Sequence, residues 1–397
     1  MTPATLRLAV PPTSRHAELC ELVGHVYGIA PERVGEWFAK AGHEHLRVML
    51  RDGDDAMVGS LLEVPMAQYF GGRSVPTMGV AGVAVAPIER GRGVGARMMV
   101  EMLRSARDRG FPLSTLYPAT VTLYRRAGYE RAGARFAIKV DPRHVEVLRE
   151  PGVVLAEVTG APEELRSLYA RAARRTNGFL DRGPYCWDRV VHPRNLTTKT
   201  FTITHEGRLE GYVVLAHVMG AYGFPTRVDV RDLAAITPRA TRAILRLLVE
   251  YRSLADEVKW EGGVNDVFAN LLPERHVTIS LIDYFMVRVI DVAAALAARG
   301  FPPNATGGFT LELDDRSMPE NSGRYGVALA EGRATVTRGG TNGARVATDE
   351  RGLAALYSGF TPAHVLADAG WLEADEATCA LLDAWLAGPT PTMRDAF

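Results

Sequence analysis

A glycine- and arginine-containing segment at residues 90–95 stands between a predicted strand and a predicted helix. The strand, at 78–86, is nearly all small or β-branched residues, which is typical of a buried strand. After the segment, apolar residues recur at helical spacing over 94–109, and Gly110 stands where a helix commonly ends. Glycines let backbone amides converge, and a helix start carries partial positive charge. The segment is therefore suited to bind a pyrophosphate.

The order of residues in this loop excludes two other phosphate-binding motifs. It lacks the Lys-Ser/Thr ending of an ATP-binding loop, and its glycines do not have the G-x-G-x-x-G spacing of a dinucleotide site. The predicted binding residues are Arg90, Gly91, Arg92, Gly93, Val94 and Gly95.

The length of 397 residues predicts two or three domains. In the first, 1–145, strands and helices alternate, which is α/β in character. Besides the strand–loop–helix unit we expect the following elements: helices at 14–28, 31–41 and 121–127, and strands at 46–51, 56–69, 113–117 and 129–140.

The second section, 146–290, repeats this order without the glycine loop, and the third, 291–397, has an α+β pattern. In the second we expect helices at 161–176 and 184–192, a hairpin around 201–215, a strand at 228–236, and a helix capped by Thr237 with Pro238 first. In the third we expect helices at 292–298, 350–357, 362–369 and 374–387, and strands at 308–314, 325–331 and 333–338.

Charge and cysteine content exclude several classes of protein. Lys plus Arg and Asp plus Glu both number 46, which gives no support for nucleic-acid or membrane-surface binding. Three widely spaced cysteines predict neither a disulfide framework nor a zinc site, and we expect no metal. The stretch at 1–8 lacks a signal-peptide core, and no apolar run approaches the ~20 residues that span a bilayer. We expect a soluble cytoplasmic protein.

The strand before the loop and the segment about 30 residues after it resemble the GNAT superfamily of acetyltransferases. The later segment runs from Leu123 through Tyr124 to Gly128-Tyr129. The resemblance implies that the loop binds the pyrophosphate of acetyl-CoA and that Tyr124 protonates the leaving thiolate. It also implies that the strand backbone binds the pantetheine arm through Val83, Ala84 and Val85. A phenol with a pKa of about 10 can deliver that proton.

Further stretches along the whole chain, at 232–238, 286–300 and the aromatic C-terminus, resemble the Eis family. This resemblance implies two tandem GNAT-like domains followed by a sterol-carrier-like α+β domain, and a homohexamer. It implies that the C-terminal carboxylate, here of Phe397, returns to the active site as a general base. It also implies that Trp37 lines the acceptor site, although core packing would explain Trp37 equally well.

The sequence departs from the family at several positions near the predicted site. Ala396 precedes the terminal aromatic where relatives can carry an acid, and Asp395 lies one step earlier. Ala81-Gly82 replaces bulkier residues, and Tyr117 stands where a relative can have histidine. We expect these changes to reshape the acceptor pocket. Asp395 and the Phe397 carboxylate are candidate contacts for a cationic amine.

Three functions remain open at this stage. The first is acetylation of primary amines of aminoglycosides or other polyamine-like small molecules. The second is acetylation of peptide or protein lysines. The third, from another class, is a lipid- or CoA-binding carrier without catalysis.

Overall fold

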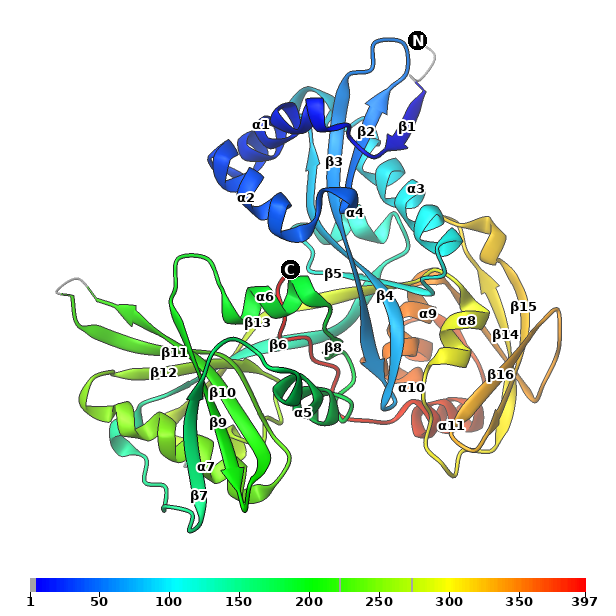
Figure 1. Ribbon diagram of the computed structural model, residues 1–397. Coiled ribbons are helices and arrows are strands. Elements are labelled where there is room, and N and C mark those ends of the chain that lie inside the picture. The colour runs from blue at the N-terminus through cyan, green and yellow to red at the C-terminus, as the bar shows by residue number, and fades with distance from the viewer. Residues whose placement is uncertain (1–4, 221–222, 273) are drawn as a thin grey trace.

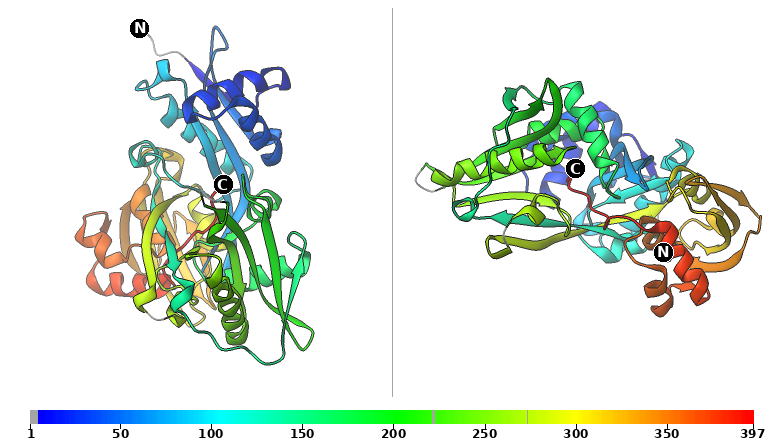
Figure 2. Two further views of the ribbon diagram at one scale, coloured as in Figure 1. Left: turned by 90° about the vertical axis from the view of Figure 1, so that its left-hand side faces the viewer. Right: turned by 90° about the horizontal axis from the view of Figure 1, so that it is seen from below.

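The protein forms three lobes that meet around its C-terminus (Figure 1). The computed structural model describes residues 5–220, 223–272 and 274–397. The stretch 1–8, for which the sequence predicts no signal peptide, starts with residues 1–4, and these four lie outside the described residues. Figure 2 shows the C-terminus near the centre of the molecule from two further directions. Within the described ranges, no helix combines the length and hydropathy that crossing a bilayer requires.

The first lobe is a sheet with helices on both faces. Leu61 and Leu62, neighbours on β3, belong to different hydrophobic cores, as alternating strand side chains must when both faces are covered. Side chains of helices α1 and α2 pack into one core, and side chains of α3 pack into the other. The elements are β1 (Leu6–Ala9), β2 (Leu46–Arg51), β3 (Met57–Phe70), β4 (Arg73–Val85), β5 (Leu113–Leu116), β6 (Glu130–Val140), α1 (His16–Tyr27), α2 (Pro31–Ala41), α3 (Val94–Asp108) and α4 (Val121–Arg125).

In the second lobe, α5 and α7 pack against the sheet that contains the hairpin β9–β10. The Thr237 side chain caps α7 by accepting from the Ala240 amide, which confirms the predicted cap. The elements are β7 (Val153–Val158), β8 (Leu180–Asp181), β9 (Thr198–His205), β10 (Arg208–Met219), β11 (Pro225–Ala235), β12 (Glu257–Gly262), β13 (Val277–Val289), α5 (Glu163–Ala173), α6 (Pro184–Val191) and α7 (Pro238–Val249).

One continuous sheet joins the first two lobes. Its order is β1-β2-β3-β4-β5-β13-β6-β12-β11-β10-β9-β7, with β8 attached to β3. Strand β13 is the link, because it lies between β5 and β6 and is antiparallel to both. We did not predict β1, β7, β8, β12 or β13 from the sequence.

The third lobe is a five-stranded sheet in the order β16-β15-β14-β17-β18, with helices packed against it. All the predicted helices and strands of this section form, and β17 and β18 are additional. The elements are α8 (Val292–Ala298), β14 (Gly307–Asp314), β15 (Gly323–Ala330), β16 (Arg333–Arg338), β17 (Ala344–Asp349), α9 (Glu350–Ser358), α10 (Ala363–Asp368), β18 (Leu372–Glu373) and α11 (Glu376–Leu386).

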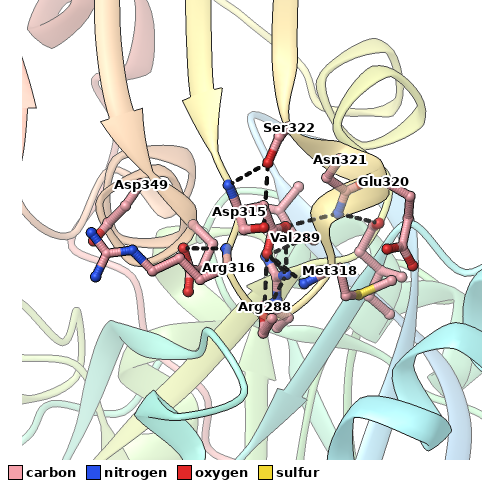
Figure 3. Close-up of polar contacts among 12 residues, drawn as sticks. Arg288, Val289, Asp315, Arg316, Met318, Glu320, Asn321, Ser322 and Asp349 are labelled. Atoms are coloured by element: carbon pink, nitrogen blue, oxygen red, sulfur yellow. Dashed lines mark hydrogen bonds and ion pairs between the residues drawn. The ribbon is translucent and has the colours of Figure 1, made fainter.

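A buried ion pair fixes the third lobe to the shared sheet (Figure 3). Arg288 of β13 bonds the carboxylate of Asp315 at 2.7 Å, and both side chains are fully buried. The same carboxylate accepts from the Met318 amide at 2.9 Å and from the Asn321 side chain at 3.0 Å. These bonds satisfy a buried charge that would otherwise be very costly.

Candidate active site

Strands β4 and β5 separate after a short region of pairing. Their parallel pairing begins at Thr77 with Leu113 and ends at Gly79 with Thr115. Strand β4 continues to Val85 while paired with β3 on its other edge. Beyond Gly79, the β5-facing edge of β4 therefore offers backbone donors and acceptors that pair with no strand in the described ranges.

The three residues predicted to bind the pantetheine arm lie in this part of β4. The register between β3 and β4 shifts at Gly82 and Val83, and Gly82 has a φ of 57°. The Tyr27 hydroxyl of α1 donates to the Val83 carbonyl at 2.9 Å, so α1 is tied to the same stretch. The structure thus places Val83, Ala84 and Val85 on an edge that an extended ligand could pair with.

The predicted phosphate loop has two glycines in the left-handed region, Gly91 at φ 78° and Gly93 at φ 81°. A Cβ added to either would meet no atom within 4 Å, so the backbone conformation, rather than lack of space, favours glycine. Gly93 caps α3, and no side chain caps the helix. The first amides of α3, beginning with Val94, therefore lack intrahelical partners and suit an anion.

The two arginines of the loop are exposed and make only weak contacts with the protein. Arg90 Nε lies 3.4 Å from the Val85 carbonyl, and Arg92 lies 3.3 Å from the carboxylate of Glu89. Exposed contacts of this kind contribute little to stability, so both guanidinium groups are available to an anion at the loop.

Tight packing at Gly95 places helix α4 against the start of α3. A Cβ on Gly95 would lie 3.1 Å from Leu123 and 3.4 Å from Val85. Tyr124 follows on α4, and its ring meets Tyr129 edge to face with centroids 6.1 Å apart. The structure therefore brings Tyr124 into the same hydrophobic cluster as Val85 and the first residues of α3.

The Tyr124 hydroxyl has no hydrogen-bond partner among the residues that the structure describes. The side chain is only 5% exposed, yet the hydroxyl is not among the fully buried unsatisfied atoms. Burial raises the pKa of Tyr124 well above the ordinary value of about 10, and Tyr27 nearby adds to this. The phenol therefore keeps its proton throughout the neutral and moderately alkaline range.

The C-terminal tail is held by the first two lobes and ends beside β4. Pro391 accepts from the Ala134 amide at 3.1 Å, and the Tyr117 hydroxyl donates to the Met393 carbonyl. At the end of the tail, the Phe397 ring lies 3.0 Å from where a Cβ on Gly79 would be. Gly79 is the last β4 residue paired with β5, so Phe397 lies where the two strands separate.

An alternating row of buried charges fixes the residues just before Phe397. Asp395 accepts from Arg182 at 2.8 Å, Arg182 also pairs with Asp232, and Asp232 pairs with Arg394 at 3.1 Å. These side chains are at most 11% exposed. In this structure the Asp395 carboxylate binds Arg182. A contact between Asp395 and the substrate stays a prediction.

Within the charge row, Asp232 remains ionised in mild acid. Burial alone would raise the pKa of Asp232, but Arg182 and Arg394 outweigh it and the pKa lies below the ordinary value. A lowered carboxylate pKa contributes stability that is complete above the unfolded value of about 3.9 and is lost as pH falls further. The tail therefore keeps this attachment at any pH where an acetyltransfer assay is practical.

Trp37 of α2 lies over the β4 bulge and packs against the core formed with α1 and α2 rather than the core formed with α3. Its ring comes within 3.0 Å of where a Cβ on Gly82 would be, and its indole nitrogen donates to the Tyr185 hydroxyl at 2.8 Å. Trp37 and Tyr185 both line a pocket of about 560 Å³ between α2 and α6. Trp187, on the same helix as Tyr185, is buried and packs edge to face on Tyr169.

Sequence reasoning missed the residues that position the tail. Arg182 and Asp232 lie about 50 residues apart and meet residues near 395 only in the folded chain. Arg189, which donates to the Ala396 carbonyl at 2.8 Å, was likewise not predicted. Asp232 stood in a stretch that resembled the family, which was the one available signal.

Comparisons with known proteins agree with this architecture. Two acetyltransferase (GNAT) domain families match residues 12–132 and 178–289, and a sterol carrier protein domain family matches 292–394. The N-acetyltransferase Eis of Mycobacterium tuberculosis is 27% identical over 390 residues, covering 91% of this chain and 92% of that protein.

Two solved structures are similar over nearly the whole chain. A GCN5-related N-acetyltransferase from Anabaena variabilis has a TM-score of 0.93 and 28% identity, covering 99% of this chain and 100% of that one. Another, from Kribbella flavida, has a TM-score of 0.87 and 29% identity, covering 100% of this chain and 99% of that one.

The fold, the separated strands and these comparisons define the chain as an N-acetyltransferase of the GNAT superfamily with two GNAT domains and a sterol-carrier-like third domain. The predicted fold class is therefore confirmed. Within the superfamily, the chain belongs to the Eis family.

Proposed function

We propose that this enzyme transfers the acetyl group of acetyl-CoA to a primary amine, with Tyr124 as the general acid and the Phe397 carboxylate as the general base. The observation that carries the proposal is the Tyr124 hydroxyl, which has no hydrogen-bond partner among the described residues and whose side chain shares a hydrophobic cluster with Val83 and Val85 of β4. Uncapped amides at the start of α3 bind the CoA diphosphate, and residues 83–85 pair with the pantetheine arm.

In the proposed reaction the amine nitrogen attacks the thioester carbonyl, a C–N bond forms, and the C–S bond breaks. The phenol of Tyr124 gives its proton to the departing sulfur. The amine proton passes, directly or through a water, to the terminal carboxylate of Phe397. An α-carboxylate is a weak base, with a pKa of about 3.5, so its larger contribution is to orient the amine.

A thiol-release assay with acetyl-CoA tests the proposal. The acceptor panel holds an aminoglycoside, a diamine and a lysine peptide, which represent the acceptors expected from the resemblance. Thiol release that depends on an amine supports the proposal. Binding of CoA without release for any amine would support the carrier alternative instead.

A C-terminal extension should impair catalysis. Adding residues after Phe397 converts its carboxylate to an amide and crowds the position beside Gly79. We expect kcat to fall at least about tenfold, which is less than the usual ~10²–10⁴-fold of general acid–base catalysis because an α-carboxylate is a weak base. The same tag at the N-terminus is the control, and full activity of the C-terminally tagged enzyme would exclude the terminal carboxylate as the base.

The pH profile should have no descending limb up to about pH 10. The amine must lose a proton to attack, so kcat/KM should rise with pH, while the raised pKa of Tyr124 keeps the acid protonated. Thiol release from pH 6 to 10 measures this. A fall near pH 8 to 9 that disappears in Tyr124→Phe would show that Tyr124 ionises there and would contradict the assignment.

We also propose, from the family resemblance, that the protein assembles as a homohexamer. Mass measurement in solution by light scattering tests this, and a stable monomer or dimer would exclude it.

A further inference from the structure

The pocket between α2 and α6 carries an excess of positive charge. The cationic residues that line it are Arg33, Lys40, Arg189, Arg194 and Arg231. Among the described residues, two carboxylates line it, those of Glu36 and Asp188. The remaining wall includes the aromatic side chains of Trp37 and Tyr185.

Most of these cations have no carboxylate partner in the described part of the chain. Lys40 pairs with Asp188 at 3.2 Å. Arg33 bonds only the side-chain oxygen of Asn195, at 2.6 Å. Arg194 lies over the Trp37 ring, 5.0 Å from its centroid.

The crowding of like charges is visible at Arg194. Partial burial lowers the pKa of Arg194, and the nearby Arg189 and Arg33 guanidinium groups lower it further, whereas Tyr185 and Glu36 act in the opposite direction. Guanidinium groups held together without matching carboxylates repel one another, and an anion placed among them would relieve this. The arrangement is therefore that of a site for a negatively charged group.

The pocket adjoins the proposed acceptor side of the active site. Trp37 forms part of its wall and also covers the β4 bulge at Gly82. Arg189 lines it and donates to the Ala396 carbonyl, one residue before Phe397. A molecule bound in the pocket therefore lies next to both the β4 bulge and the C-terminus.

We infer that the acceptor is a primary amine that also carries an anionic group, a carboxylate or a phosphate, which binds among Arg33, Arg194 and Arg231 while the amine faces the thioester. This inference rests on the proposed acetyl transfer and names the class of acceptor. A polycationic acceptor such as an aminoglycoside would bring positive charge to a wall that is already positive.

Acceptors that differ only at the far end test the inference. We expect 6-aminohexanoate to be acetylated with a kcat/KM at least about tenfold above that of 1,6-diaminohexane, which is about 1.4 kcal/mol. Phosphoethanolamine, compared with ethanolamine, tests phosphate in place of carboxylate. Equal or greater activity with 1,6-diaminohexane or an aminoglycoside would overturn the inference and leave the acetyltransferase proposal standing.

The double variant Arg194→Gln/Arg231→Gln should remove most of the preference through a higher KM for 6-aminohexanoate, with the KM for acetyl-CoA unchanged. Arg252→Gln, an exposed arginine outside the pocket, is the matched control. A loss of acetyl-CoA affinity in the double variant would show that the pocket binds CoA phosphates and would overturn the inference.

Two measurements on the unaltered enzyme guard against misfolding of the variant. Protection of thermal stability by 6-aminohexanoate but not by 1,6-diaminohexane supports the anion site, and equal protection contradicts it. Absence of thiol release with every amine, together with normal binding of acetyl-CoA, would instead reject the proposed function.

Discussion

Replacing Tyr124 by phenylalanine should lower kcat by about 10²–10⁴-fold, the usual contribution of a positioned general acid. The affinity for acetyl-CoA should change little, because the hydroxyl bonds to none of the described residues and the ring keeps its contacts with Tyr129. Single-turnover thiol release measures the chemical step, and titration with acetyl-CoA measures binding.

Tyr129→Phe is the matched control for this variant. Tyr129 lies in the same cluster, but its hydroxyl is fully buried and bonded to Ser114 at 2.7 Å. Its loss should reduce stability by about 1 kcal/mol and leave kcat near normal. Equal loss of kcat and of cofactor affinity in Tyr124→Phe would instead identify Tyr124 as a structural tyrosine.

Replacing Asp315 by alanine should lower the free energy of unfolding by about 3–5 kcal/mol. The change leaves the Arg288 guanidinium charged and fully buried without a counterion, and it removes the acceptor for Met318 and Asn321. The melting temperature and the urea midpoint measure the loss.

The neighbouring Asp314 provides the control for Asp315. Its side chain is 71% exposed and lies 3.6 Å from Arg316, so Asp314→Ala should change the free energy of unfolding by at most about 0.5 kcal/mol. Similar melting temperatures for the two variants would show that the buried pair does not hold the third lobe in place.

Asp315→Ala should also reduce activity at temperatures where the protein remains folded. Gly128, which follows α4, approaches the pair so closely that a Cβ there would lie 2.7 Å from Arg288 Nε. Movement of Arg288 therefore reaches the turn that fixes Tyr124. Thiol release well below the melting temperature separates this effect from unfolding.

Local patterns were sufficient for the elements that build the phosphate loop. The glycines of 90–95 and the helical spacing of Met98, Met102 and Ala106 are local signals, because each depends only on residues a few positions apart in the sequence. The observed α3 and its buried face agree with that prediction. Helix α7 could be predicted in the same way, because its capping residue Thr237 directly precedes it in the sequence.

Strand β13 could not be predicted in the same way. Ile279, Leu281 and Ile282 are apolar yet about 39–46% exposed, so no clean alternation marks which face is buried. Its position between β5 and β6 depends on contacts across more than a hundred residues, which the segment's own sequence does not specify.

The residues of the candidate site also fall into two groups, those that the local sequence predicts and those that only the folded chain brings together. Residues 83–85 and 90–95 and Tyr124 come from one continuous stretch, and their types suggested their chemistry. The position of Phe397 near the active site was predicted from the family resemblance alone. The charge row that holds the tail was not predicted and is seen only in the structure. Arg182, Asp232 and Asp395 are ordinary charged residues in sequence, and burial alone distinguishes them.

The position of β13 bears on how a ribosome must make this enzyme. When β6 emerges, the strand that belongs between it and β5 is still roughly 150 residues away, about 7–30 seconds of synthesis. During that interval both strands present uncovered hydrogen-bonding edges to other nascent chains. The sheet of the catalytic domain is thus completed late in translation. A gene fragment that stops after β6 would encode an incomplete sheet whose unpaired strand edges favour aggregation.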